Sequence, residues 1–195
     1  MATQQFRTPS DQIGSEVLAA GLAILEEEGP DGFTVRAIAT RANVAPMAIY
    51  NHFDGKNGVL EAIWNEGFEQ LRMDLSSSSD DPHADVIAAG LAYRRFALEH
   101  RAHYTVMFMH HFVGFEPSLD ASHGAARTFQ ELVTHVERCQ ALGFFGSHRA
   151  TNVAQMMWAT SHGYVALEIL NINFSDDPDA TFKSLLNGLW SGLAR

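Results

Sequence analysis

A stretch of 23 residues, from Thr34 to Lys56, constrains the fold of this chain more than any other part of the sequence. Its spacing predicts two short helices joined by a tight turn, followed by the start of a third. Thr34 can cap the first helix, because its hydroxyl can accept a free backbone N–H, and Ile38 and Ala42 then share one face. Asn43 lies where the chain must reverse, and Asn tolerates the left-handed backbone conformation that such a reversal requires.

The second half of this stretch predicts a helix with one inward and one outward face. Pro46 fits its first turn, because an N–H would lack a partner there in any case. Ile49 and Phe53 share the inward face, which leaves an outward face of Met47, Ala48, Asn51 and His52. Two short helices joined in this way form a helix-turn-helix, a unit whose second helix enters the major groove of DNA.

Composition places the whole chain among globular proteins. Of its 195 residues, 46% are hydrophobic and 18% are charged, which suits one or two domains with a buried core. No apolar run reaches the roughly 18 residues that a membrane span needs, and the N-terminus lacks the pattern of a secretory signal. The single cysteine, Cys139, excludes an internal disulfide and suits a reducing compartment. We therefore expect a cytoplasmic protein without a membrane partner.

The formal net charge of −10 would by itself argue against a DNA-binding protein. Phosphate attraction, however, falls off over a Debye length of about 10 Å at 0.1 M salt. Between Thr34 and Lys56, three cations (Arg36, Arg41 and Lys56) and one anion (Asp54) give a local balance of +2. This balance permits DNA binding, whereas the charge of the whole chain should weaken non-specific binding.

The rest of the chain predicts helices and no strands, so the expected fold is all-α. We expect an N-terminal three-helix helix-turn-helix domain over residues 1–57 and a C-terminal helical bundle over residues 58–195. A start signal at Thr8–Asp11 opens the first helix, and a polar break follows the long helix that begins at Lys56. Further helices are expected over residues 85–100, 103–112, 123–142 and 147–172 and from about 178 onward, with an irregular segment over 114–122.

The N-terminal motif resembles the TetR family of bacterial transcriptional repressors. The resemblance rests on a first helix ending in Glu-Gly and then on Thr34, Ala39, Ala42, Val44, Ile49-Tyr50-x-x-Phe53, Lys56 and Leu60. A weaker resemblance, to the ligand-binding domain of one branch, covers Arg95–His100 and the Trp-x-x-x-His-Gly run Trp158–Gly163. The resemblance implies a homodimer that binds a palindromic operator through its N-terminal domains and a small effector through its C-terminal domain.

The resemblance and the outward face together give the candidate DNA-binding residues: Thr34, Arg36, Ala45, Pro46, Met47, Tyr50, Asn51, His52 and Lys56. By resemblance Tyr50 donates its hydroxyl to a phosphate, and Lys56 and His52 act likewise. Ala45 stands where relatives carry a Ser or Thr cap, and loss of that cap costs roughly 1 kcal/mol of helix stability. Ala45, Pro46 and Met47 offer apolar contacts, which match thymine methyl groups. Alternatively, Tyr50 and His52 pack structurally, and Arg36 is a solvated surface charge.

The C-terminal half contains aromatic residues, methionines and histidines that suit either an apolar effector pocket or an ordinary helical core. The pocket candidates are Tyr104, Phe108, His111, Met156 and His162. Although the chain has ten histidines, no HExxH or comparable spacing appears, and no nucleophile is paired with a base. The sequence therefore predicts no metal, no cofactor and no enzymatic activity.

In relatives, the two long C-terminal helices form a four-helix dimer interface. The candidate interface residues are apolar or small: Phe129, Leu132, Val136, Val153, Ala159, Gly163 and Leu167. The alternative is that the same face packs inside its own subunit.

We therefore interpret the sequence as a dimeric, ligand-responsive transcriptional repressor. Three alternatives stay open: a DNA-binding protein without a small effector, a helical metal-binding protein or enzyme that uses the histidines, and an activator instead of a repressor.

Overall fold

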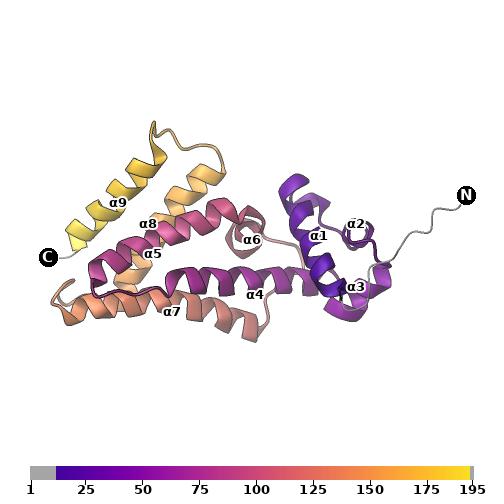
Figure 1. Ribbon diagram of the computed structural model, residues 1–195, viewed down its shortest axis with the longest axis horizontal. Coiled ribbons are helices and arrows are strands. Elements are labelled where there is room, and N and C mark those ends of the chain that lie inside the picture. Colours follow the sequence, from indigo (N-terminus) through magenta and orange to yellow (C-terminus); the bar gives the residue numbers. More distant parts are fainter. Residues whose placement is uncertain (1–11, 194–195) are drawn as a thin grey trace, which may run out of the picture. The chain divides into compact units, whose positions relative to one another are not determined.

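The computed structural model describes residues 12–193, and the regular secondary structure of this range is helical, without strands (Figure 1). The all-α prediction is thereby confirmed. None of the described helices is long and apolar enough to cross a lipid bilayer. By its contacts the chain divides into two compact units, of which the first comprises residues up to Gly67 together with Ala102–Ala121. The second comprises Phe68–Arg101 and the residues from Ser122 onward.

The first unit contains the helices that the N-terminal sequence predicts. They are α1 (Ile13–Glu27), the 3-10 turn η1 (Pro30–Gly32), α2 (Val35–Arg41), α3 (Pro46–Phe53) and the first part of α4 (Lys56–Leu75). After an interval in the second unit, the chain returns with α6 (Arg101–Tyr104) and the π-helical turn η2 (Thr105–Met109). The predicted start signal at Thr8–Asp11 lies outside the described residues, and α1 begins after Gln12.

Local chemistry explains the boundaries of the short helices. The hydroxyl of Thr34 accepts a hydrogen bond from the N–H of Ala37 at 3.1 Å, which confirms the predicted cap. Asn43 has φ of 53°, so it takes the left-handed conformation that the turn was expected to need. Ala45 precedes α3 without a side-chain cap, and Pro46 is the first helical residue.

One hydrophobic core holds the first unit together. Ile38, Ile49 and Leu60 are fully buried in it, and Phe33 is 2% exposed. Residues from the returning segment complete the core: Ala102, Val106, Phe112 and Phe115. The sequence predicted a helix over 103–112, but the helical turns end at Met109. Phe112 instead lies in a loop, where its ring packs edge-on against Phe33 at a centroid distance of 6.1 Å.

The second unit contains the rest of α4, α5 (Pro82–Glu99), most of α7 (Leu119–Ala141), α8 (Ala150–Ile169) and α9 (Pro178–Leu193). One part of its core consists of Val86, Val133, Val136, Cys139, Phe145, Val153, Ala154, Met157 and Trp190. Burial raises the pKa of the Cys139 thiol to about 11, so Cys139 is an inert packing residue at neutral pH.

Two partly buried ion pairs tie helices of the second unit together. Arg94 of α5 donates two hydrogen bonds to the carboxylate of Glu168 in α8, at 2.6 and 2.7 Å. Asp85 accepts hydrogen bonds from the N–H and hydroxyl of Ser79 and from Arg138. Burial alone would raise the pKa of Asp85, but the Ser79 bonds and the Arg138 cation together lower it to about 2. Its carboxylate therefore stays ionised at neutral pH.

Gly58, in the first turn of α4, is the glycine that the backbone of the first unit requires most strictly. A Cβ at this position would lie 1.3 Å from the carbonyl oxygen of Phe53, the last residue of α3. We expect Gly58→Ala to lower the free energy of unfolding by about 3 kcal/mol or more, because backbone must move to relieve the clash.

The matched control is Gly14→Ala in α1, where a Cβ meets nothing within 4 Å. Alanine there should be neutral or stabilise by up to about 1 kcal/mol. Urea unfolding followed by circular dichroism measures both variants. Equal stabilities of the two would contradict the close approach of α3 and α4 at Gly58.

Candidate nucleic-acid interface

The outward face of α3 is open to solvent. Ile49 is fully buried, whereas Met47 is 65% and Tyr50 52% exposed. Pro46, Asn51 and His52 are exposed as well. A large apolar side chain and an aromatic ring exposed on one short helix point to a contact surface.

The exposed ring of Tyr50 lies against the backbone of the turn that follows α3. A Cβ at Gly55 would be 3.1 Å from Cε1 of Tyr50, and Gly55 has φ of 86°. Asp54, just before it, also takes the left-handed conformation, with φ of 58°. The Asp54–Gly55 pair thus ends α3 sharply and leaves room for the tyrosine ring.

The three cations of the helix-turn-helix stretch Thr34–Lys56 differ in whether they are free to bind a phosphate. Arg41 forms an ion pair with Glu27 of α1 at 2.5 Å and approaches Glu28 at 4.0 Å, and the hydrogen bond to Glu27 raises its pKa. Arg36 and Lys56, by contrast, form no ion pair with any of the described residues 12–193. Among the described residues of the first unit, the positive charge that can be offered to a phosphate therefore comes mainly from Arg36 and Lys56.

A shallow hollow of about 440 Å³ lies beside the start of α2. Thr34 and Arg36 line it, together with Ile24, Glu28, Ala37, Thr40 and Arg41. Thr34 is exposed although its oxygen accepts the capping hydrogen bond, so its hydroxyl proton remains available to an outside acceptor.

All nine candidate DNA-binding residues thus belong to the first unit and lie between α2 and the start of α4. Seven of them are exposed, and Ala45 and Lys56 are half-buried. A helix-turn-helix packed on its own core, with an exposed second helix flanked by cations, defines a DNA-binding transcriptional regulator.

Two family models match the chain. Residues 17–63 match the bacterial regulatory proteins of the tetR family, and residues 86–189 match the tetracyclin repressor-like C-terminal domain. The chain belongs to the TetR family of transcriptional regulators, as the sequence motif predicted, and it is not an enzyme.

Three relatives and solved structures illustrate the similarity; they are distant but align with most or all of the chain. An uncharacterised HTH-type transcriptional regulator of Mycobacterium tuberculosis is 26% identical over 100% of this chain and 87% of its own length. A solved structure from Rhodococcus sp. RHA1 has a TM-score of 0.83 and 26% identity, covering 99% of this chain and 100% of that chain. A TetR variant from Acinetobacter baumannii AYE, in complex with minocycline, has a TM-score of 0.63 and 23% identity, covering 91% of this chain and 94% of that chain.

The candidate effector residues fall into both units. Tyr104, Phe108 and His111 belong to the first unit, where Tyr104 is fully buried and its ring lies tilted against that of Phe108, with a centroid distance of 5.0 Å. Met156 and His162 belong to the second unit, where Met156 is 39% exposed and His162 is half-buried. Their role in effector binding stays a prediction.

His162 takes part in a polar network that the sequence did not predict. The indole N–H of Trp158 donates to the hydroxyl oxygen of Tyr93 at 3.2 Å, and that oxygen lies 2.8 Å from Nδ1 of His162. An indole N–H can only donate, so the Tyr93 hydroxyl accepts from Trp158 and its own proton can be donated to Nδ1 of a neutral His162. Burial lowers the pKa of His162, which favours this neutral form. Trp158 and His162 share the resembling motif, but nothing in the sequence pairs them with Tyr93.

The candidate dimer residues differ in exposure. Val136 and Val153 are fully buried in the core of their own protomer, so they offer no surface to a partner. Phe129 and Leu132 are half-buried and pack against the same core. Ala159, Gly163 and Leu167 are exposed along one side of α8, so these three offer the most surface to a partner, and Phe129 and Leu132 keep part of theirs.

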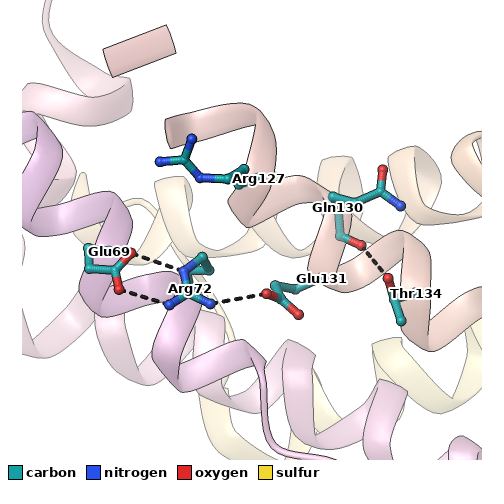
Figure 2. A pocket seen from close by; sticks show the side chains of 6 residues that line it. All are labelled: Glu69, Arg72, Arg127, Gln130, Glu131 and Thr134. Carbon is teal, nitrogen blue, oxygen red and sulfur yellow. Dashed lines mark hydrogen bonds and ion pairs between the residues drawn. The ribbon is translucent and has the colours of Figure 1, made fainter. Parts of the chain in front are cut away.

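A polar groove of about 340 Å³ lies between α4 and α7 in the second unit (Figure 2). Arg72 donates to both oxygens of Glu69, at 2.9 and 2.8 Å, and to Glu131 of α7 at 3.2 Å. Arg127, Gln130 and Thr134 line the same groove. The sequence analysis did not predict this cluster; the opposite charges of Glu69 and Arg72, three residues apart, are the local signal that could have pointed to it.

Histidines do not gather into a metal site in the described part of the chain. No group of three or more His, Cys, Asp or Glu residues within 12–193 is placed to hold a metal ion. His100 and His103 fall on opposite sides of the division between the units.

The pKa of His162 gives a pH dependence with a defined sign. Because this pKa lies below the ordinary value of 6.5 in the folded protein, the unfolded chain binds the proton more readily. The stability contributed by neutral His162 is therefore complete above pH 6.5 and is lost as the pH falls below that value. We expect His162→Asn, which keeps an acceptor near the position of Nδ1, to lose less stability than the unmodified protein between about pH 7 and about pH 5.

Urea unfolding midpoints across this pH range measure the difference. His123→Asn, at an exposed position, is the control and should follow the unmodified protein. Identical pH slopes for His162→Asn and the unmodified protein would show that His162 is not held neutral by its surroundings.

Proposed function

We propose that this protein is a repressor that binds a palindromic operator as a homodimer and is released by a small apolar or aromatic effector. The observation that carries the proposal is the exposed outward face of α3, with Met47 and Tyr50 projecting from a head whose core buries Ile49 completely. We place its action in the bacterial cytoplasm, where the operator DNA lies.

In this proposal, contacts to phosphates position the head, and contacts to bases specify the sequence. Thr34, Arg36, Tyr50, His52 and Lys56 hold the phosphate backbone. Ala45, Pro46 and Met47 meet thymine methyl groups, and the Asn51 amide reads a base edge, most naturally adenine. Because the outward face of α3 carries few hydrogen-bond donors, much of the sequence specificity would come from contacts with thymine methyl groups and from DNA shape.

Dimerisation is supported by the exposed side of α8. Ala159 and Gly163 are four residues apart on one face and would allow close approach of a helix from a second copy, with Leu167 beside them. A two-fold dimer would set its recognition helices about 34–36 Å apart, the distance of one DNA turn. That geometry requires a palindromic operator.

The effector proposal rests on the family and on the residues of the C-terminal half. The Acinetobacter protein is in complex with minocycline, so a protein of this fold binds that small molecule. Here the candidates are Tyr104, Phe108, His111, Met156 and His162. An effector releases DNA only to the extent that it binds more tightly to a conformation of the dimer in which the two DNA-binding units are wrongly spaced for the operator.

Selection of bound fragments from random duplex DNA, repeated at several salt concentrations, tests the proposal. We expect an enriched palindrome with half-sites one turn apart and affinity that falls steeply with salt. Enrichment of a single half-site would contradict the dimer, and enrichment of no sequence would contradict specific operator binding.

Thymine methyl groups under α3 should contribute to the affinity. We expect replacement of the half-site thymines by uracil, which lacks only the methyl, to weaken binding by roughly 1 kcal/mol per contacted base, the low end for a specific base contact. Titration of the selected operator in both forms measures this, with thymines outside the half-sites replaced as the control. Unchanged affinity would exclude methyl reading.

Tyr50 and Lys56 should affect DNA binding in different ways. Tyr50→Phe removes one neutral donor to a charged phosphate and should weaken operator binding by about ten-fold, with little change in the salt slope. Lys56→Gln removes a cation and should reduce the salt slope by about 1 if Lys56 binds one phosphate. Tyr164→Phe is the matched control, because Tyr164 donates to the carbonyl of Pro178 in the second unit. If Tyr50→Phe binds DNA like this control, Tyr50 is a packing aromatic.

A further inference from the structure

The segment Ala102–Ala121, which follows α5, is built into the DNA-binding unit. Phe112 and Phe115 are 4% and 7% exposed in the core that also buries Ile38 and Ile49. Phe115 packs edge-on against Trp64 of α4, with ring centroids 6.2 Å apart. The first unit therefore depends on residues that lie far along the chain from the helix-turn-helix.

Hydrogen bonds at three residue pairs fasten this segment to the first half of α4. The side-chain N–H of Asn57 donates to the carbonyl of Gly114 at 2.6 Å. The Ser118 hydroxyl donates to Glu61 at 2.7 Å, and the indole N–H of Trp64 donates to the carbonyl of Ala121 at 3.4 Å. We call these three bonds the α4 clamp.

The three bonds of the α4 clamp share one geometry. Each joins residues 57 positions apart, and Asn57, Glu61 and Trp64 are spaced i, i+4, i+7, so they share one face of α4. Their partners advance along the chain by the same steps. The segment therefore runs alongside α4 in the same direction, and a shift of either would strain all three bonds together.

At the centre of the α4 clamp, the two carboxylate oxygens of Glu61 accept two hydrogen bonds from Ser118. One accepts the Ser118 hydroxyl, and the other accepts the Ser118 backbone N–H at 3.3 Å. The Ser118 hydroxyl oxygen in turn accepts the N–H of Ala121 at 3.2 Å, as a cap at the start of α7. A carboxylate at the start of a helix is also favoured by the helix dipole, so Glu61 docks where α7 begins.

The position of the α4 clamp in the sequence connects it to DNA binding. Asn57 directly follows Lys56, and Asp54 and Gly55 alone separate α4 from α3. We infer that Asn57, Glu61 and Trp64 are positioning residues for DNA binding, which hold the start of α4, and through it Lys56 and α3, by gripping Gly114–Ala121. This inference goes beyond the proposed repressor and applies to DNA binding in general.

Ser118→Asp tests the inference without removing the cap. Asp caps helices as well as Ser does, but its carboxylate would face Glu61 and replace a donor with a like charge. Glu61→Gln in the same protein supplies an amide donor to that new carboxylate, so the pair is restored with reversed polarity. Ser122→Asp is the matched control, because it adds the same charge at an exposed position in the first turns of α7.

Two readouts are taken on the full-length protein well below its unfolding temperature. The first is affinity for the operator fragment obtained by selection, and the second is amide hydrogen exchange in α3 and the first turn of α4, without DNA. We expect Ser118→Asp to weaken operator binding roughly ten-fold and to speed this exchange, as for a coupled pair of contacts. The double variant Ser118→Asp with Glu61→Gln should recover to within about three-fold of the unmodified protein, and Ser122→Asp should stay within that range throughout.

Should Ser118→Asp fail to fold, Asn57→Ala replaces it, because Asn57 is exposed and its substitution removes only the first bond of the α4 clamp. The inference is overturned if the clamp variant and Ser122→Asp behave alike in both readouts, or if thermal stability falls while both readouts stay unchanged. If the unmodified protein selects no operator, the proposed repressor fails, whereas the exchange measurement still decides whether the α4 clamp holds α3 and the start of α4 in place.

Discussion

Burial of Ile49 is the constraint on which the DNA-binding surface depends. α3 has only eight residues, and each residue turns the helix by about 100°, so one buried side chain fixes the rotation of the whole helix. With Ile49 facing the core, Met47, Tyr50 and Asn51 must face outward. Gly58 lets α4 pass close to the end of α3, and the Asp54–Gly55 turn makes the sharp connection between them. The recognition surface is therefore a consequence of core packing.

Electrostatics then limits how this surface can bind. The net charge of the chain is −10, and Arg41 is already paired with Glu27. Both features should weaken non-specific attraction to DNA, because the phosphates repel a net negative charge and a paired cation is less available to displace counterions. In the proposed repressor, contacts of Tyr50 and of the apolar residues before it then supply a larger share of the affinity. Weak binding to non-specific DNA would also help the protein to find its operator among the many competing sites of a genome.

The sequence predicted the local features of the fold and missed the distant ones. The Thr34 cap, the left-handed Asn43 and the inward Ile49 follow from residue type and spacing within a few positions. The ion pair of Arg41 with Glu27 was missed, because no periodic pattern links residues on different helices. The same reason hid the Tyr93–His162 contact.

Phe112 shows that a helical spacing of apolar residues does not always predict where a helix ends. Its apolar neighbours continue a helical pattern from His103, and the pattern predicts a helix through Phe112. The chain instead leaves the helix at Met109, because Phe112 is buried against Phe33 in a core assembled from distant segments. Tertiary burial outweighs local propensity here, since burying a phenylalanine is worth about 1.5–3 kcal/mol and helix propensities differ by less than about 1 kcal/mol per residue.

The path of the chain makes the α4 clamp relevant to control by an effector. The backbone passes between the two units at Gly67–Phe68, Arg101–Ala102 and Ala121–Ser122. The first and third passages lie inside α4 and α7, and the α4 clamp joins these same two segments on the side of the first unit. A helix carries a displacement along its hydrogen-bonded backbone, whereas a flexible linker would absorb it. In the proposed repressor, an effector would act on DNA binding through these two helices, and the size of its effect is bounded by the difference in its affinity for the two arrangements.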